Sequence, residues 1–179
     1  MMGMHIIIKH LTAADIQADM LCTFKHSQRI TRKWVKIAGQ WTLTDTNDLR
    51  EWDANNRVWI TEYMREQIAR GGAVVGAWCG DTLIGFCCID GILRGTKFRY
   101  VNLTMLFVDD DWHRRGIGKQ LLAAVCVHAR CLGATKLFIS AIPSVDTVAF
   151  YQATGCTDAM EVITDFVDTE NDRYMEYSL

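Results

Sequence analysis

Residues 107–119 read Phe-Val-Asp-Asp-Asp-Trp-His-Arg-Arg-Gly-Ile-Gly-Lys, and they join an apolar, strand-like run to an amphipathic stretch typical of a helix. Gly116 and Gly118 remove side chains that would hold a ligand away from the main chain at the helix start. The N–H groups of a first helical turn have no partner inside the helix, and the helix dipole favours an anion there. Three basic side chains add positive charge at the same point: Arg114, Arg115 and Lys119. The segment therefore predicts a site for a phosphate or pyrophosphate group.

Two common phosphate-binding motifs do not fit these residues. A P-loop requires G-x-x-x-x-G-K-[ST], but Gln120 follows Lys119 and His113 stands in place of the first glycine. A dinucleotide-binding fingerprint requires G-x-G-x-x-G, but Leu121 stands in place of the third glycine. What remains is the pattern x-x-x-G-x-G, which follows a strand and opens a helix.

That pattern resembles the acyl-CoA loop of the GCN5-related N-acetyltransferase (GNAT) superfamily, which is usually written [RQ]-x-x-G-x-[GA]. Residues 113–118 match it except at His113, where the family usually carries Arg or Gln. Such a loop binds pyrophosphate largely through main-chain N–H groups, so the departure alters one side chain and leaves the main-chain site. The alternative is an ordinary strand–turn–helix connection whose glycines serve only the turn.

A second segment, residues 143–156, resembles the family's N-x-x-A-x-x-F-Y-x-x-x-G-F pattern. Phe150, Tyr151 and Gly155 stand in register with it. Three positions carry Ser for Asn, Thr for Ala and Cys for Phe: Ser144, Thr147 and Cys156. The two motifs occur in the family's order with one expected strand between them, which makes the pair more specific than either motif alone.

The resemblance is good over residues 73–160 and weaker over the first 70, and it implies a GNAT-like fold. We expect one acyl-CoA N-acyltransferase domain over residues 1–179, of the α/β (mixed α+β) class, with a central mixed sheet of six or seven strands flanked by helices. The resemblance implies acetyl-CoA as the acyl donor and no metal. It assigns donor binding to these residues: Leu106, Phe107, Val108, His113, Arg114, Arg115, Gly116, Ile117, Gly118, Lys119, Ser144 and Tyr151.

The remaining segments are predicted from their hydrophobic pattern. Strands are expected at residues 5–9, 73–79, 82–89, 99–108, 134–141, near 158–166 and at 173–179. Two further β segments that meet at Gly39 predict a hairpin insertion over residues 28–45. Helices are expected at 12–23, where Thr12 and Asp15 form a capping-box pattern, at about 46–70, after residue 116, and between Ser144 and Gly155.

Composition excludes several classes of function. Half of the 179 residues are apolar and 22% are charged, which indicates a folded chain. The net charge of −2 provides no broad basic surface, so no nucleic-acid partner is expected. No apolar run approaches a membrane span or a signal peptide, so no membrane partner is expected. The seven cysteines are odd in number and contain no C-x-x-C pair, which favours the reducing cytoplasm over a disulfide framework or a zinc site.

The catalytic groups are only partly predictable. Tyr151 matches the tyrosine that serves the family as general acid and protonates the departing CoA thiolate; the alternative is a tyrosine that only packs in the core. The glutamate base of the family's histone-acetylating members corresponds to Asn102, which takes no proton; the alternatives for Asn102 are to orient a water or the amine, or simply to face solvent. Asp90 is a candidate base in a position where most aspartates only start a turn. No base is assigned, and the aspartates at 109–111 are expected to form a solvated turn.

Acceptor specificity is expected to lie in the 28–45 hairpin and the long helix after it. Four tryptophans of this region suit either an aromatic wall that binds an amine by cation–π contact or simple core filling: Trp34, Trp41, Trp52 and Trp59. The sequence does not choose among a polyamine, an amino acid, an aminoglycoside and a peptide amine.

The leading hypothesis is an acetyl-CoA-dependent N-acetyltransferase that acetylates a primary amine of a small molecule by direct attack in a ternary complex. The alternatives are a protein or peptide N-acetyltransferase, a non-catalytic acyl-CoA-binding or sensing module, and a regulatory dimer subunit. Asn102 in place of the glutamate favours the sensing module, whereas Tyr151 favours the enzyme. A homodimer stays open, because the sequence shows no decisive interface.

Overall fold

The computed structural model describes residues 5–179. Its strands are β1 (Ile6–Leu11), β2 (Ser27–Ile37), β3 (Gln40–Glu51), β4 (Ala73–Cys79), β5 (Thr82–Ile89), β6 (Tyr100–Val108), β7 (Lys136–Ala141), β8 (Thr157–Asp158) and β9 (Arg173–Ser178). Its α-helices are α1 (Ala54–Ala69), α2 (Ile117–Cys131) and α3 (Val145–Ala153), and its short 3₁₀ helices are η1 (Ala13–Asp15), η2 (Asp110–Trp112) and η3 (Thr164–Phe166).

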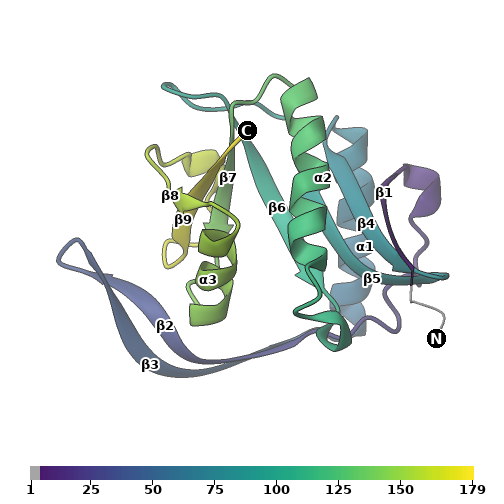
Figure 1. The fold of residues 1–179 in the computed structure, drawn as a ribbon, viewed down its shortest axis with the longest axis horizontal. Coiled ribbons are helices and arrows are strands. Elements are labelled where there is room, and N and C mark those ends of the chain that lie inside the picture. Colours follow the sequence, from purple (N-terminus) through teal and green to yellow (C-terminus); the bar gives the residue numbers. More distant parts are fainter. Residues whose placement is uncertain (1–4) are drawn as a thin grey trace.

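Seven strands form one mixed sheet in the order β1-β4-β5-β6-β7-β9-β8, and β2 and β3 form a separate two-stranded hairpin. β6 and β7 run parallel, and the other paired neighbours in the sheet are antiparallel. α1 covers one face of the sheet, whereas α2 and α3 cover the other (Figure 1). The expected α/β class and the sheet of six or seven strands are confirmed.

The packing of α2 follows from its sequence. Four apolar residues spaced four apart line one side of the helix and are at most 1% exposed: Ile117, Leu121, Val125 and Ala129. This spacing forms a continuous apolar stripe. The stripe packs on β4, β5 and β6, whose side chains on that face are buried. α2 therefore packs firmly on the sheet at the point where the glycine-rich loop enters the helix. None of the helices in residues 5–179 combines the length and apolar character that crossing a membrane requires.

The helix expected over residues 12–23 is wrong. The Asp15 carboxylate accepts hydrogen bonds from the N–H and hydroxyl of Thr12, both at 2.7 Å, but only η1 follows. Three apolar side chains of the segment instead enter the core beside α1: Ile16, Leu21 and Phe24. Their spacing does not form one helical face, so burial by tertiary contacts outweighs the local capping signal.

The hairpin predicted around Gly39 is present but reaches well beyond residues 28–45. Ser27 pairs with Glu51 at its base, so residues 46–51, expected to be helical, belong to β3. Pairing with β2 satisfies backbone groups that a helix would otherwise satisfy internally.

The long helix predicted from about residue 46 therefore begins late, at Ala54. Asp53 is its N-cap, and its carboxylate accepts from the Asn56 N–H at 2.8 Å while the Asn56 side chain accepts from the Asp53 N–H at 3.0 Å. This reciprocal cap supplies the N-terminal groups of α1 with partners and defines its start.

The strand expected near residues 158–166 is wrong beyond its first residues. β8 has only two residues, and the chain then turns so that η3 lies against the sheet. Two side chains of this turn pack on aromatic residues of β6 and β7: Ile163 and Phe166, against Tyr100 and Phe138. The last predicted strand is present as β9.

Candidate functional site

β6 and β7 separate before either strand ends (Figure 1). They pair over three residues each, the last pair being Asn102 with Phe138. Beyond it, residues 103–108 pair with β5 on their other edge, with a bulge at Thr104. Backbone N–H and C=O groups on the free edge of β6 lack a strand partner, and such groups are costly when buried. The opening therefore suits an extended ligand that carries amide groups.

The glycine-rich loop leads from β6 into α2 as predicted. Gly116 is the N-cap of α2 with φ +75°, and Arg114 before it has φ +60°. A Cβ built on Gly116 would meet no atom within 4 Å, so the space beside the loop is open. The N–H groups of residues 117–119 precede the first intrahelical hydrogen bond, which runs from the Gln120 N–H to the Gly116 carbonyl at 3.1 Å. These N–H groups are available to an anion.

The positive charge around the loop is not neutralised by the protein. Within residues 5–179, no salt bridge includes any of the three basic side chains: Arg114, Arg115 and Lys119. His113 Nε2 donates to the Val108 carbonyl at 2.8 Å and so closes the turn, in the position where the family carries Arg or Gln. The Ile117 side chain is buried, so this residue offers a ligand only its main chain.

α3 packs against the start of α2. A Cβ built on Gly118 would lie 3.0 Å from Cε2 of Phe150, so the glycine permits the close approach of that ring. α3 begins as predicted, because the Ser144 hydroxyl accepts from the Thr147 N–H at 3.1 Å. Gly155, at φ +97°, lies just past its end. The end of β6, the loop and α3 therefore meet at one place.

Tyr151 lies on α3 and is buried in the cluster on the α2 side of the sheet. Its ring meets that of Phe150 edge-on, with centroids 5.2 Å apart. Burial raises the pKa of Tyr151 far above its ordinary value, with smaller contributions from Cys87 and Cys156. The phenol is therefore uncharged at neutral pH.

The acidic turn after β6 is structural, contrary to the expectation of a solvated turn. Asp109 is 7% exposed, and its carboxylate accepts from the Lys25 N–H at 2.8 Å. The Asp110 carboxylate accepts from the Ser27 N–H, also at 2.8 Å, and Asp111 pairs with the Lys25 ammonium at 2.6 Å. These bonds attach the base of the β2–β3 hairpin to the end of β6.

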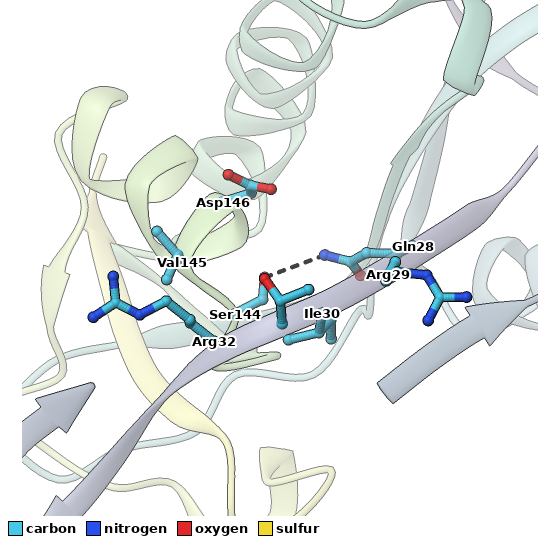
Figure 2. A pocket seen from close by; sticks show the side chains of 8 residues that line it. Gln28, Arg29, Ile30, Arg32, Ser144, Val145 and Asp146 are labelled. Carbon is cyan, nitrogen blue, oxygen red and sulfur yellow. Dashed lines mark hydrogen bonds between the residues drawn. The ribbon is translucent and has the colours of Figure 1, made fainter. Parts of the chain in front are cut away.

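The same hairpin is attached on the far side of the opening. The Trp34 N–H donates to the Pro143 carbonyl at 2.7 Å, and the Gln28 side-chain amide donates to the Ser144 hydroxyl at 3.1 Å (Figure 2). Ser144, predicted to bind the donor, is buried here and bonded to Gln28 and Thr147. The hairpin thus spans the end of the sheet at which β6 and β7 separate.

Two hollows lie beneath the hairpin. One, of about 200 Å³, lies between β2 and the start of α3, and Figure 2 shows its lining. The other, of about 270 Å³, lies between the hairpin, the turn that precedes α3 and residues 169–172. Residues 113–119 line neither hollow, so both belong to a part of the opening distinct from the loop.

The four tryptophans do not form one aromatic wall. Trp34 and Trp41 of the hairpin lie over the Arg173 guanidinium, at 5.5 and 4.8 Å from its central carbon to their ring centroids. Trp52 packs on the cluster beneath α1, and Trp59 is exposed on α1. The four tryptophans therefore have three different environments: Trp34 and Trp41 attach the hairpin, Trp52 packs in the core, and Trp59 lies on the surface.

Asp90, the candidate base, and Asn102 lie side by side. The Asp90 carboxylate accepts from the Asn102 N–H at 3.2 Å and from the Ile92 N–H at 3.4 Å, and burial raises its pKa. Asn102 is 9% exposed, and its Oδ1 atom has no hydrogen-bond partner. Residues 5–179 contain no group of three or more His, Cys, Asp or Glu side chains placed to hold a metal ion.

Solved structures of acetyltransferases share this fold. A nourseothricin acetyltransferase superposes with a TM-score of 0.67 at 14% identity, covering 97% of this chain and 98% of that one. The PaiA N-acetyltransferase of Thermoplasma acidophilum, in complex with coenzyme A, gives 0.62 at 19% identity and coverage of 98% and 100%. An aminoglycoside N-acetyltransferase in complex with CoA gives 0.60 at 18% identity and coverage of 90% and 93%. No curated protein is significantly similar in sequence.

The sequence itself matches the acetyltransferase (GNAT) family over residues 40–156, which is well over half of the chain. This range contains both predicted motifs, the parting of β6 and β7, and α3. The chain therefore belongs to the GNAT family and is an acetyl-CoA-dependent acetyltransferase.

Proposed function

We propose that this enzyme acetylates a primary amine of a small molecule by direct transfer from acetyl-CoA in a ternary complex. The observation that carries the proposal is the meeting of the free edge of β6, the open loop and α3 at one place. We also place the protein in the cytoplasm, in keeping with seven cysteines that are all free.

The residues present fit an acyl-CoA donor. The N–H groups of residues 117–119, with Arg114 and Lys119 unpaired beside them, suit its pyrophosphate. The backbone of residues 106–108 offers strand-like hydrogen bonds to the amides of its pantetheine arm. We assign Leu106, Phe107 and Val108 to donor binding on this ground.

The chemistry requires an oxyanion to be stabilised and a thiolate to be protonated. A backbone N–H on the free edge of β6 supplies the first function, an effect worth about 3 kcal/mol per donor in acyl-transfer enzymes. Tyr151 supplies the second, because its buried phenol keeps its proton at neutral pH. We therefore assign Tyr151 as the general acid.

A small acceptor is supported by the hairpin, which covers the end of the opening and leaves hollows of about 200 and 270 Å³ beneath it. Structural neighbours named for nourseothricin and for aminoglycosides support the same class of acceptor.

A thermal-shift series with CoA, acetyl-CoA and longer acyl-CoAs tests the donor site. A ligand present at 100 times its Kd raises the free energy of unfolding by about 2.7 kcal/mol, which gives a clear shift in Tm. Thiol release from acetyl-CoA is then followed over a panel of amines. No shift at millimolar acetyl-CoA contradicts the donor site, and a shift without thiol release for any small amine contradicts the proposed acceptor class.

A further inference from the structure

The opening between β6 and β7 has two sides. Side chains alternate along a strand, so Val101 and Leu103 face α2 and the Tyr151 cluster, whereas Asn102 faces the α1 side. On β7, Ser140 shares this second face with Phe138, the register partner of Asn102. The residues proposed to bind acetyl-CoA thus lie on one side of the opening, and Asn102 lies on the other.

Asn102 presents an unsatisfied acceptor at the point where the strands part. Its side chain is 9% exposed, and no group bonds to Oδ1. A buried carbonyl oxygen without a partner is unfavourable, so this atom is expected to accept a hydrogen bond from a ligand.

The turn before β9 is held against this face by Ser140. The Ser140 hydroxyl accepts from the Asp168 N–H at 3.1 Å and donates to Asp172 at 2.8 Å. The other oxygen of Asp172 accepts from Thr169 at 2.9 Å. Within residues 5–179, the carboxylates of Asp168 and Glu170 in this turn accept no hydrogen bond, and Asp168 is the one whose own N–H binds Ser140.

The carboxylates on this face are not engaged in ion pairs. Within residues 5–179, none of its three carboxylates takes part in a salt bridge: Asp90, Asp168 and Asp172. Asp168 is exposed, yet desolvation by surrounding atoms and the neighbouring Asp172 raise its pKa. Burial raises the pKa of Tyr63 on α1, and the charges of Asp168 and Asp90 add to this, which places Tyr63 on the same face.

We propose that this face binds the acceptor as a primary ammonium, which donates to Asn102 Oδ1 and gives its proton to the Asp168 carboxylate. The groups gathered here are hydrogen-bond acceptors with excess negative charge, and an ammonium group is their complement. Asp168 rather than Asp90 takes the proton, because two backbone N–H groups already bind Asp90.

The inference rests on the proposed function and completes its proton balance. The ammonium transfers one proton to Asp168, and the freed nitrogen lone pair forms the bond to the thioester carbonyl carbon. The carbon–sulfur bond breaks with its electron pair on sulfur, and the thiolate takes a proton from Tyr151. The second nitrogen proton then re-protonates Tyr151 through solvent, and Asp168 releases its proton, leaving an amide, a thiol and one proton in solution.

The test compares Asp168→Asn with Glu170→Gln, which removes the same charge from an exposed position in the same turn. Spermidine is the probe with a charged amine, and aniline is the probe whose amine is uncharged at neutral pH. We expect Asp168→Asn to lower kcat/KM for spermidine about 100-fold. We expect little change with aniline or in the KM for acetyl-CoA, and Glu170→Gln is expected to behave as the unmodified enzyme.

Calorimetric titration of spermidine into the CoA-loaded protein gives a readout independent of turnover. Asp168→Asn is expected to weaken this binding about tenfold, the loss of one charged contact. Equal losses with spermidine and aniline, or unchanged spermidine binding, overturn the role of Asp168 while leaving the donor site intact. Failure of acetyl-CoA to stabilise the protein overturns the proposed function instead.

The pH profile provides a further check. The charge of Asp172 in its own turn acts on Asp168, and the charges of Asp168 and Asp90 both act on Tyr63 of α1. A base must be unprotonated, so kcat/KM for spermidine is expected to fall as pH drops through the raised pKa of Asp168. Asp168→Asn is expected to lose this acidic limb, and a limb that persists unchanged contradicts the assignment.

Discussion

The loop at residues 113–119 and the face around Asn102 lie on opposite sides of the same opening, yet they are built differently. The loop is one contiguous segment whose main-chain N–H groups and positive φ angles form the site. The opposite face takes side chains from α1, β6, β7 and the turn before β9. Recognition by main-chain groups tolerates a side-chain change such as His113. Binding at the face around Asn102 instead depends on the identity of each side chain.

The largest effect is expected at Tyr151, whose side chain is proposed to protonate the CoA thiolate. Tyr151→Phe is expected to lower kcat about 100-fold with the KM for acetyl-CoA unchanged, because the proton donor is lost and the ring remains. Steady-state kinetics with acetyl-CoA varied measure both constants. Tyr177→Phe removes a hydroxyl from a residue packed on the same cluster and is the control. Equal rates for the two variants would make Tyr151 a core residue only.

The main-chain character of the loop is tested by a pair of glycines with the same backbone strain. Gly116 and Gly39 have φ +75° and +82°, and a Cβ on either meets no atom within 4 Å. Replacement of either by Val is expected to cost about 1–2 kcal/mol of unfolding free energy, because both positions are left-handed. Only Gly116→Val is expected to weaken acetyl-CoA binding, by about tenfold or more, since its side chain fills space that the ligand needs. Thermal shift measured with and without acetyl-CoA separates the loss of stability from the loss of acetyl-CoA binding. If acetyl-CoA raises the Tm of both variants equally, the loop site is contradicted.

The smallest effect is expected where the hairpin meets α3. Ser144→Ala and Asp53→Ala each remove a helix N-cap, and each is expected to cost about 1 kcal/mol in urea unfolding. Ser144 also holds Gln28, so its loss loosens the hairpin over the opening. We therefore expect only Ser144→Ala to raise the KM for the acceptor amine. If both variants leave that KM unchanged, the hairpin does not shape the acceptor side.

The failed predictions lie where local signals compete with distant contacts. Thr12 and Asp15 do form their local bonds, but the segment after them is bent so that Phe24 and its neighbours reach the core. Residues 46–51 carry a helix-compatible sequence, yet β2 pairs with them. Asp109 reads as part of a polar turn, but it is buried because it holds the Lys25 backbone. A partner that lies in another segment of the chain leaves no trace in the local pattern.

Sequence alone determined the segments that we propose to bind the donor: the strand, the loop with Gly116 and Gly118, the helix after it and the capped α3 that carries Tyr151. Each of these depends on backbone conformation and apolar spacing within a short stretch, which the order of residues specifies directly. Only the tertiary structure decided how far the hairpin reaches, where β6 and β7 part, and that Asn102, Ser140 and Asp168 share one face. These features arise from contacts between distant segments, whose free energy comes from packing and hydrogen bonding in the folded chain.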